Sequence, residues 1–144
     1  MVHALSEIRR TLKPGGILID LRPFGDAWPV EVASSTGHLV AGHLTDMPTG
    51  VADDAAAFAA MTDAESRGWF VRETEDEFAF FYYWDRPSEM KEWMDAEWKD
   101  FVEIGEDAYQ KTKALWASAN ADARVRVRVK MTITRWRRVE IPKG

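Results

Sequence analysis

The fold is decided by residues 3–24, which read HALSEIRRTLKPGGILIDLRPF. The first half of this stretch carries apolar residues at helical spacing, namely Ala4, Leu5, Ile8 and Leu12. The sequence Pro14–Gly16 then ends the helix, because proline and glycine both interrupt helical structure. The apolar run Ile17–Leu21 has the length and β-branched content of a buried strand. Residues 3–22 therefore predict a helix, a tight turn and a strand, which form half of a right-handed crossover.

The run EIRRTLKPGGILIDL in this stretch resembles the helix and fifth strand of class I S-adenosylmethionine-dependent methyltransferases, which have a Rossmann-like fold. That family typically reads E-x-x-R-x-L-K-P-G-G before an apolar strand. The matching residues are Glu7, Arg10, Leu12, Lys13, Pro14, Gly15 and Gly16. The segment lies late in the family's fold, so the resemblance implies that this chain corresponds to the C-terminal half of a methyltransferase. The same glycines are also explained as an ordinary helix end, where glycine accepts positive φ.

Composition sets the general class of the protein. The chain has 144 residues, of which 46% are apolar and 30% charged, as expected for a single globular domain over residues 1–144. No apolar run approaches the roughly 20 residues of a membrane span, and residues 1–20 do not resemble a signal peptide. We therefore expect a cytoplasmic protein that does not bind membranes. The absence of cysteine excludes disulfides, a thiolate nucleophile and cysteine-ligated zinc.

Hydrophobic periodicity predicts the remaining elements in turn. These are a hairpin over 29–45, a helix over 51–67, a strand over 69–84, a helical insertion over 86–119 and a strand over 123–138. The expected fold class is α/β, with a mostly antiparallel sheet of three core strands. The resemblance implies that the last strand is inserted beside Ile17–Leu21, and that the hairpin and the two-helix insertion are additions to a partial methyltransferase fold.

The strand over 123–138 alternates strictly between apolar and basic or polar residues. Its predicted buried face holds Val125, Val127, Val129, Met131 and Ile133. Residues 123–144 carry a charge of +7 and the other 122 residues carry −12. Such a basic ribbon can bind nucleic acid, but cross-strand pairs with acids such as Glu73, Glu75 and Glu77 use the same side chains. We therefore expect that nucleic acid is not a partner.

Histidines in the predicted hairpin invite a metal hypothesis. His38 and His43 are five residues apart, so a strand places their side chains on opposite faces, and Asp46 alone does not complete a site. We expect no metal site.

Two groups of residues are candidates for binding a ligand. In the resembled family, the end of the fifth strand and the loop after it line the acceptor pocket. The resemblance implies that the corresponding residues here are Asp20, Arg22, Phe24 and Trp28. Arg22 can clamp an anion or pair with Asp20 or Asp26. The second group is an aromatic pocket or core formed by Trp28, Phe80, Tyr82, Trp84 and Trp93. The candidate ligand residues are thus Asp20, Arg22, Phe24, Trp28, Tyr82 and Trp84, and no catalytic residue is identified.

The cofactor motifs of the resembled family are not found. Its glycine-rich loop follows a strand and precedes a helix, whereas Gly15 and Gly16 follow a helix and precede a strand. The isolated chain is therefore expected to bind no cofactor, and to use S-adenosylmethionine only if another chain completes the fold.

Three hypotheses for the function follow from these observations. The first is a methyltransferase-like module, inactive alone, that self-associates or binds a partner. The second is a subunit completed by a cofactor-binding chain, and the third is a small-molecule binding protein with an aromatic pocket. An apolar strand edge at Ile17–Leu21 favours a homodimer that buries this edge, the 29–45 hairpin, or both.

Overall fold

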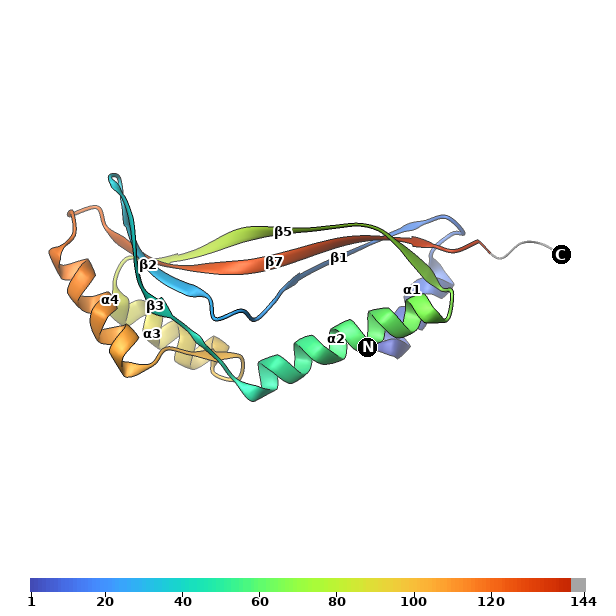
Figure 1. The fold of residues 1–144 in the computed structure, drawn as a ribbon, viewed down its shortest axis with the longest axis horizontal. Helices are drawn as coiled ribbons and strands as arrows, with labels where there is room; N and C mark the ends of the chain where they lie inside the picture. Colours follow the sequence, from blue (N-terminus) through green and yellow to red (C-terminus); the bar gives the residue numbers. More distant parts are fainter. Residues whose placement is uncertain (141–144) are drawn as a thin grey trace. The chain divides into compact units, whose positions relative to one another are not determined.

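The computed structural model describes residues 1–140 as a mixed α/β chain with a mostly antiparallel sheet, which confirms the expected general class (Figure 1). The helices are α1 (Val2–Thr11), α2 (Pro48–Ser66), α3 (Pro87–Trp93) and α4 (Glu106–Ser118). A π-helical turn, Met94–Trp98, continues α3. The strands are β1 (Ile17–Pro23), β2 (Pro29–Ser34), β3 (Gly37–His43), β4 (Thr45–Asp46), β5 (Phe70–Trp84), β6 (Val102–Glu103) and β7 (Arg124–Arg138).

The main sheet is organised around β7. Strand β1 pairs antiparallel with the second half of β7, from Ile17 opposite Arg137 to Pro23 opposite Met131. Strand β2 pairs antiparallel with the first half of β7 and also with β3, while β5 pairs with β7 as well. The expected position of the last strand beside β1 is thus confirmed. Within the described part of the chain the sheet has five strands instead of three, because the 15 residues of β7 are enough to pair with both β1 and the hairpin.

The chain divides into two compact units. Unit 1 contains Met1–Pro23, Ala52–Phe78 and the described residues from Met131 onward, and unit 2 contains Phe24–Val51 and Ala79–Lys130.

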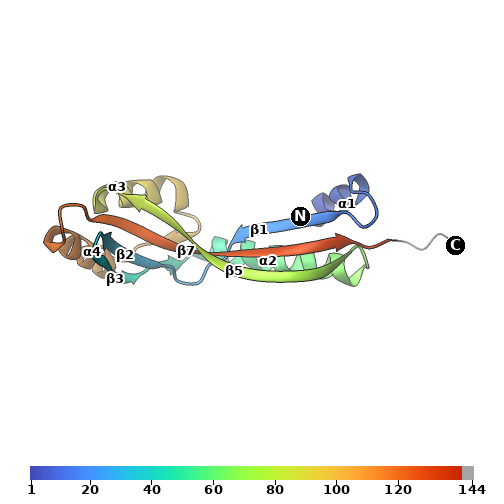
Figure 2. The same cartoon turned by 90° about the horizontal axis from the view of Figure 1, so that it is seen from above.

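In unit 1, helices α1 and α2 lie on one side of the strands (Figures 1 and 2). The core between them contains Leu5, Ala60, Met61, Ala64, Phe70 and Trp136, with Ile8, Leu12, Leu18 and Trp69 packed against it. The turn between α1 and β1 requires its glycines. Gly15 has φ +74°, and a Cβ on Gly16 would lie 2.7 Å from the carbonyl oxygen of Lys13. The Pro-Gly-Gly sequence is therefore explained by backbone geometry.

The buried face of β7 differs from the predicted one in unit 1. Thr132, Thr134 and Trp136 are buried, whereas Met131 and Ile133 are only half-buried. The prediction of one continuous apolar face is therefore wrong beyond Val129. The strand still alternates, but in this unit the helices cover its even-numbered residues.

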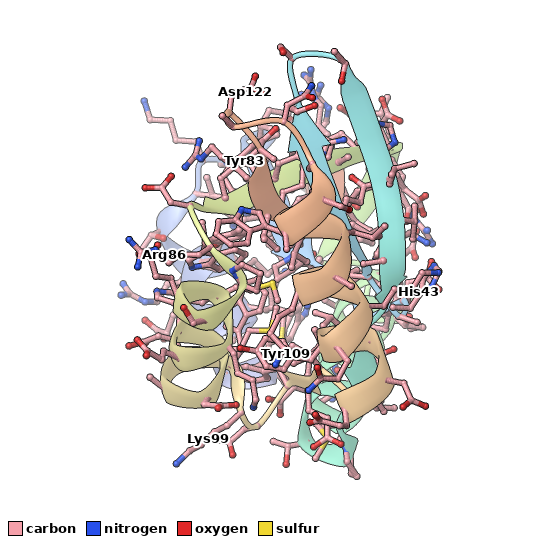
Figure 3. The ribbon with its side chains drawn as sticks, turned by 90° about the vertical axis from the view of Figure 1, so that its left-hand side faces the viewer. His43, Tyr83, Arg86, Lys99, Tyr109 and Asp122 are labelled. Carbon is pink, nitrogen blue, oxygen red and sulfur yellow. The ribbon has the colours of Figure 1, made fainter. Side chains whose placement is uncertain are left out.

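In unit 2 the predicted face of β7 is buried. Its core contains Val30, Val32, Met90, Met94, Val125, Val127 and Val129. Helices α3 and α4 lie side by side, and Tyr109 of α4 lies between them, where the ammonium group of Lys91 is 5.8 Å from its ring (Figure 3). Helix α4 also packs closely on the hairpin, since a Cβ on Gly42 would lie 2.8 Å from the Cβ of Ala108.

Candidate functional site

The six predicted ligand residues divide between the two units. Asp20 and Arg22 belong to unit 1, whereas Phe24, Trp28, Tyr82 and Trp84 belong to unit 2. We therefore consider each group within its own unit.

Arg22 is paired with Asp20, two residues before it on β1. The guanidinium Nε and Nη2 donate to the Asp20 carboxylate at 2.7–2.9 Å. The other predicted partner, Asp26, instead accepts a hydrogen bond from Lys130 at 3.2 Å. The salt-bridge alternative is thus the one that the structure shows, and an anion would have to compete with Asp20 for Arg22.

A shallow pocket in unit 1 lies beside this pair. It is lined by Asp20, Arg22, Ala57, Phe58, Met61, Thr62, Arg72, Glu75, Thr132, Thr134 and Trp136. A hydrogen bond from Arg72 to Glu75 at 2.8 Å raises the pKa of Arg72. The charged side chains that line the pocket are two arginines and two acids, and its free space of about 40 Å³ suits a few water molecules. The pocket therefore has no charge excess that selects an anionic ligand.

Strand β1 presents an open edge in unit 1. Among the residues that the structure describes, it is the terminal strand of its sheet and pairs on one side only, with β7. The side chains of Ile19 and Leu21 point away from the helices and are 52% and 54% exposed. Among the described residues of this unit, no element covers that side of the strands (Figure 1). An apolar strand edge of this kind favours pairing with another chain.

The acidic residues of β5 are partly used within unit 1. Glu73 accepts hydrogen bonds from Arg137 and, at 2.8 Å, forms an ion pair with Arg135. These contacts, led by the Arg137 hydrogen bond, lower the pKa of Glu73. Glu75 pairs with Arg72 on its own strand instead of with β7. The expected cross-strand pairing is thus found at Glu73 and is wrong for Glu75.

Aromatic rings gather in unit 2 around Trp98. Its ring centroid lies 4.8 Å from that of Trp93, 5.0 Å from Tyr82, 5.7 Å from Trp28 and 6.2 Å from Trp84. Phe80 contacts Tyr82 at 5.3 Å. The predicted aromatic group is therefore brought together, and its rings contact one another, mostly edge to face.

Trp98 itself was not among the predicted pocket residues. In a regular α-helix, residues five apart lie about 140° apart around the axis, so Trp93 and Trp98 point in different directions. The π-helical turn over Met94–Trp98 closes hydrogen bonds five residues apart and brings the two rings together. No sequence signal predicted the π-turn.

Phe24 and Trp28 are held by local contacts. The indole N–H of Trp28 donates to the carbonyl oxygen of Phe24 at 2.8 Å. The ammonium group of Lys130 lies 5.3 Å from the Phe24 ring. Trp28 is buried, so it serves the core of unit 2 in the structure.

The basic residues of β7 in unit 2 pair with acids of the same unit. Arg124 bonds Asp85 at 3.1 Å, and Arg126 bonds Glu31 at 2.7 Å. Arg126 also lies 4.4 Å from the Phe81 ring and Arg124 4.9 Å from the Tyr83 ring. Since Phe81 also contacts Arg128 and Tyr83 contacts Arg124, β5 and β7 run antiparallel here.

Glu31 is the buried anion of this ribbon. Its side chain is 2% exposed, and besides Arg126 it has Arg128 and His38 at 3.5 Å. Burial lowers the pKa of Arg126, but hydrogen bonds to Tyr83 and Glu31 raise it more, so the net shift is upward. The guanidinium groups of Arg124 and Arg126 are thus paired within the unit, and Lys143 lies outside the described residues.

Two further searches concern metals and membranes. Within residues 1–140, no group of three or more histidine or acidic side chains is placed to hold a metal ion. Over the same residues, no helix combines the length and the apolar character needed to cross a membrane.

Comparisons of the chain with protein-family models, with curated proteins and with solved structures give no significant match. The function is therefore argued from the strands and side chains described above.

Proposed function

We propose that this chain is a partner-binding module with a methyltransferase-like fold, which corresponds to the second half of an S-adenosylmethionine-dependent methyltransferase and transfers no methyl group by itself. The strand order carries the proposal. Strand β7 lies between β1 and β5, and α2 directly precedes β5, after the strands β2, β3 and β4 that follow β1. The resembled family likewise has a fifth strand, a helix and two further strands, the last of which is inserted beside the fifth.

The open edge of β1 is the element that we assign to partner binding. In the resembled family, the strand that corresponds to β1 pairs with a fourth strand on its other side. Here that side of β1 has no strand partner among the described residues, and half-exposed Ile19 and Leu21 flank it. Covering such a strand buries apolar surface and satisfies main-chain groups.

The isolated chain is expected to show no binding of S-adenosylmethionine tighter than about millimolar, since within residues 1–140 no glycine-rich loop joins a strand to a helix N-terminus. Isothermal titration calorimetry of the chain with this cofactor measures the constant directly. A micromolar constant would show that the chain holds a cofactor site, and the proposal would then be wrong.

A homodimer is expected in solution, with an interface of about 1,200 Å² or more. Light scattering at micromolar concentration should give twice the single-chain mass. Leu21→Lys at the β1 edge should shift the protein to monomer, because it places two positive charges together at the symmetric interface, where like charges repel. Val51→Lys, at an equally exposed apolar residue of α2, is the matched control and should leave the dimer intact.

Leu39→Lys tests the second predicted interface, the 29–45 hairpin, because the side chain of Leu39 is also exposed. Dissociation by Leu39→Lys alone would move the interface to the hairpin. A monomer of the unchanged chain at every concentration would contradict self-association.

The same open edge favours one second candidate, a subunit completed by a cofactor-binding chain. In that case S-adenosylmethionine binding appears only when the two chains are mixed. The small-molecule hypothesis receives less support, because the rings around Trp98 contact one another.

A further inference from the structure

We infer that a second copy of this chain pairs antiparallel along β1, with the two-fold axis passing at Leu21; this inference rests on the proposed partner-binding function. In this register Leu21 lies opposite the partner's Leu21, Asp20 lies opposite the partner's Arg22, and Ile19 lies opposite the partner's Pro23. The result is a continuous sheet across the dimer.

The main chain of β1 shows which groups are available at the edge. Phe24 N–H donates to the carbonyl oxygen of Lys130 at 2.9 Å, and Arg138 N–H donates to that of Gly16 at 2.8 Å. Hydrogen-bonded pairs alternate along an antiparallel ladder, so the even-numbered residues of β1 bond to β7. The main-chain groups of Ile17, Ile19 and Leu21 therefore point to the open edge.

The position of Pro23 agrees with the assignment of odd-numbered main-chain groups to the open edge. It is odd-numbered, so its missing N–H falls on the open side and costs β1 no bond to β7. With the axis at Leu21, the two Leu21 residues exchange two main-chain hydrogen bonds. Each Ile19 N–H also donates to the carbonyl oxygen of the partner's Pro23, which gives about four bonds in total.

Charge selects this register among the alternatives. An axis at Asp20 places the two Asp20 carboxylates opposite each other, and an axis at Arg22 does the same with two guanidinium groups. An axis at Ile19 places Asp20 opposite the partner's Leu18. Only the axis at Leu21 sets opposite charges across the interface. The side chains of Arg22 and Asp20 are 20% and 19% exposed, so each can contact the ion pair of the partner.

The outer edge of β5 is a poor alternative for self-pairing. It carries Glu73, Glu75, Asp76 and Glu77 within five residues. Two such strands would bring these acids together, and like charges on an edge oppose strand addition. The β1 edge has no such excess of one charge.

Cysteine scanning tests the register, because the chain has no native cysteine. Leu21→Cys should form a covalent dimer on mild oxidation, since residues facing each other across strands approach within about 5.5 Å, which a disulfide spans. Ile19→Cys should not, because the two copies of residue 19 are then roughly 14 Å apart. Cross-linking of Ile19→Cys but not of Leu21→Cys would overturn the register.

Charge reversal supplies an independent test on the same chain. Asp20→Arg and Arg22→Asp each place like charges across the interface, and we expect each to weaken dimerisation by about ten-fold or more. The double variant Asp20→Arg/Arg22→Asp restores opposite charges and should dimerise within about three-fold of the unchanged chain. Circular dichroism checks that each variant folds.

The outcomes separate the inference from the proposed function. If the unchanged chain dimerises but neither single reversal weakens it, the register is wrong while partner binding stands. If the unchanged chain stays monomeric, the homodimer and the register both fail.

Discussion

Replacing Trp136 with alanine is expected to lower the free energy of unfolding by about 3–5 kcal/mol. Trp136 is 4% exposed and packs in the core of unit 1 with residues of α1, α2 and β5. Truncation removes a large apolar side chain and leaves a cavity between the sheet and the helices. Urea denaturation followed by circular dichroism measures the loss, and a loss below about 1 kcal/mol would contradict this account of the core.

Ile133→Ala is the matched control on the same strand. Ile133 is half-buried and lies on the face that the helices do not cover, so we expect a loss of about 1 kcal/mol, well below that of Trp136→Ala. If Ile133→Ala lowered the free energy of unfolding more than Trp136→Ala, the face of Ile133 would be the buried one, as the sequence pattern predicted.

The different burial of Trp136 and Ile133 shows what the alternating sequence of β7 could predict and what it could not. Alternation predicted a strand over residues 123–138, which the structure has over Arg124–Arg138, and it predicted which residues share a face. It could not establish which face the helices cover, because that depends on where α1 and α2 pack. Val125, Val127 and Val129 were correctly predicted to be buried, whereas Met131 and Ile133 were not.

The candidate sites show the same division between local and tertiary information. The turn at Gly15–Gly16 and the pairing of β1 beside β7 followed from local signals and from the resemblance. Asp20 was one of the two carboxylates predicted as partners of Arg22, besides the alternative of a bound anion, and the structure shows the pair with Asp20. The partner of Arg126 could not be predicted, because Glu31 lies 95 residues away and its register depends on the pairing of β2 with β7.

Breaking the ion pair between Glu31 and Arg126 is expected to have the second large effect on the free energy of unfolding. Arg126→Met is expected to lower the free energy of unfolding at neutral pH by about 3 kcal/mol, because it leaves a buried carboxylate without its hydrogen-bonded partner. The side chain of Glu31 is 2% exposed, and its remaining basic neighbours, Arg128 and His38, are each 3.5 Å away. The 3.5 Å contacts of Arg128 and His38 are too long to replace the 2.7 Å hydrogen bond from Arg126.

Arg124→Met is the matched control, because Arg124 lies on the same face of β7 but pairs with exposed Asp85. We expect it to cost less than about 1 kcal/mol. The double variant Glu31→Met/Arg126→Met removes both charges, and a buried pair exchanged for apolar residues is often nearly neutral. The double variant should therefore be more stable than Arg126→Met, and thermal unfolding of the four proteins decides this. If the double variant were as unstable as Arg126→Met, the loss would come from packing of the guanidinium against Phe81, which lies 4.4 Å away, and not from the uncompensated carboxylate.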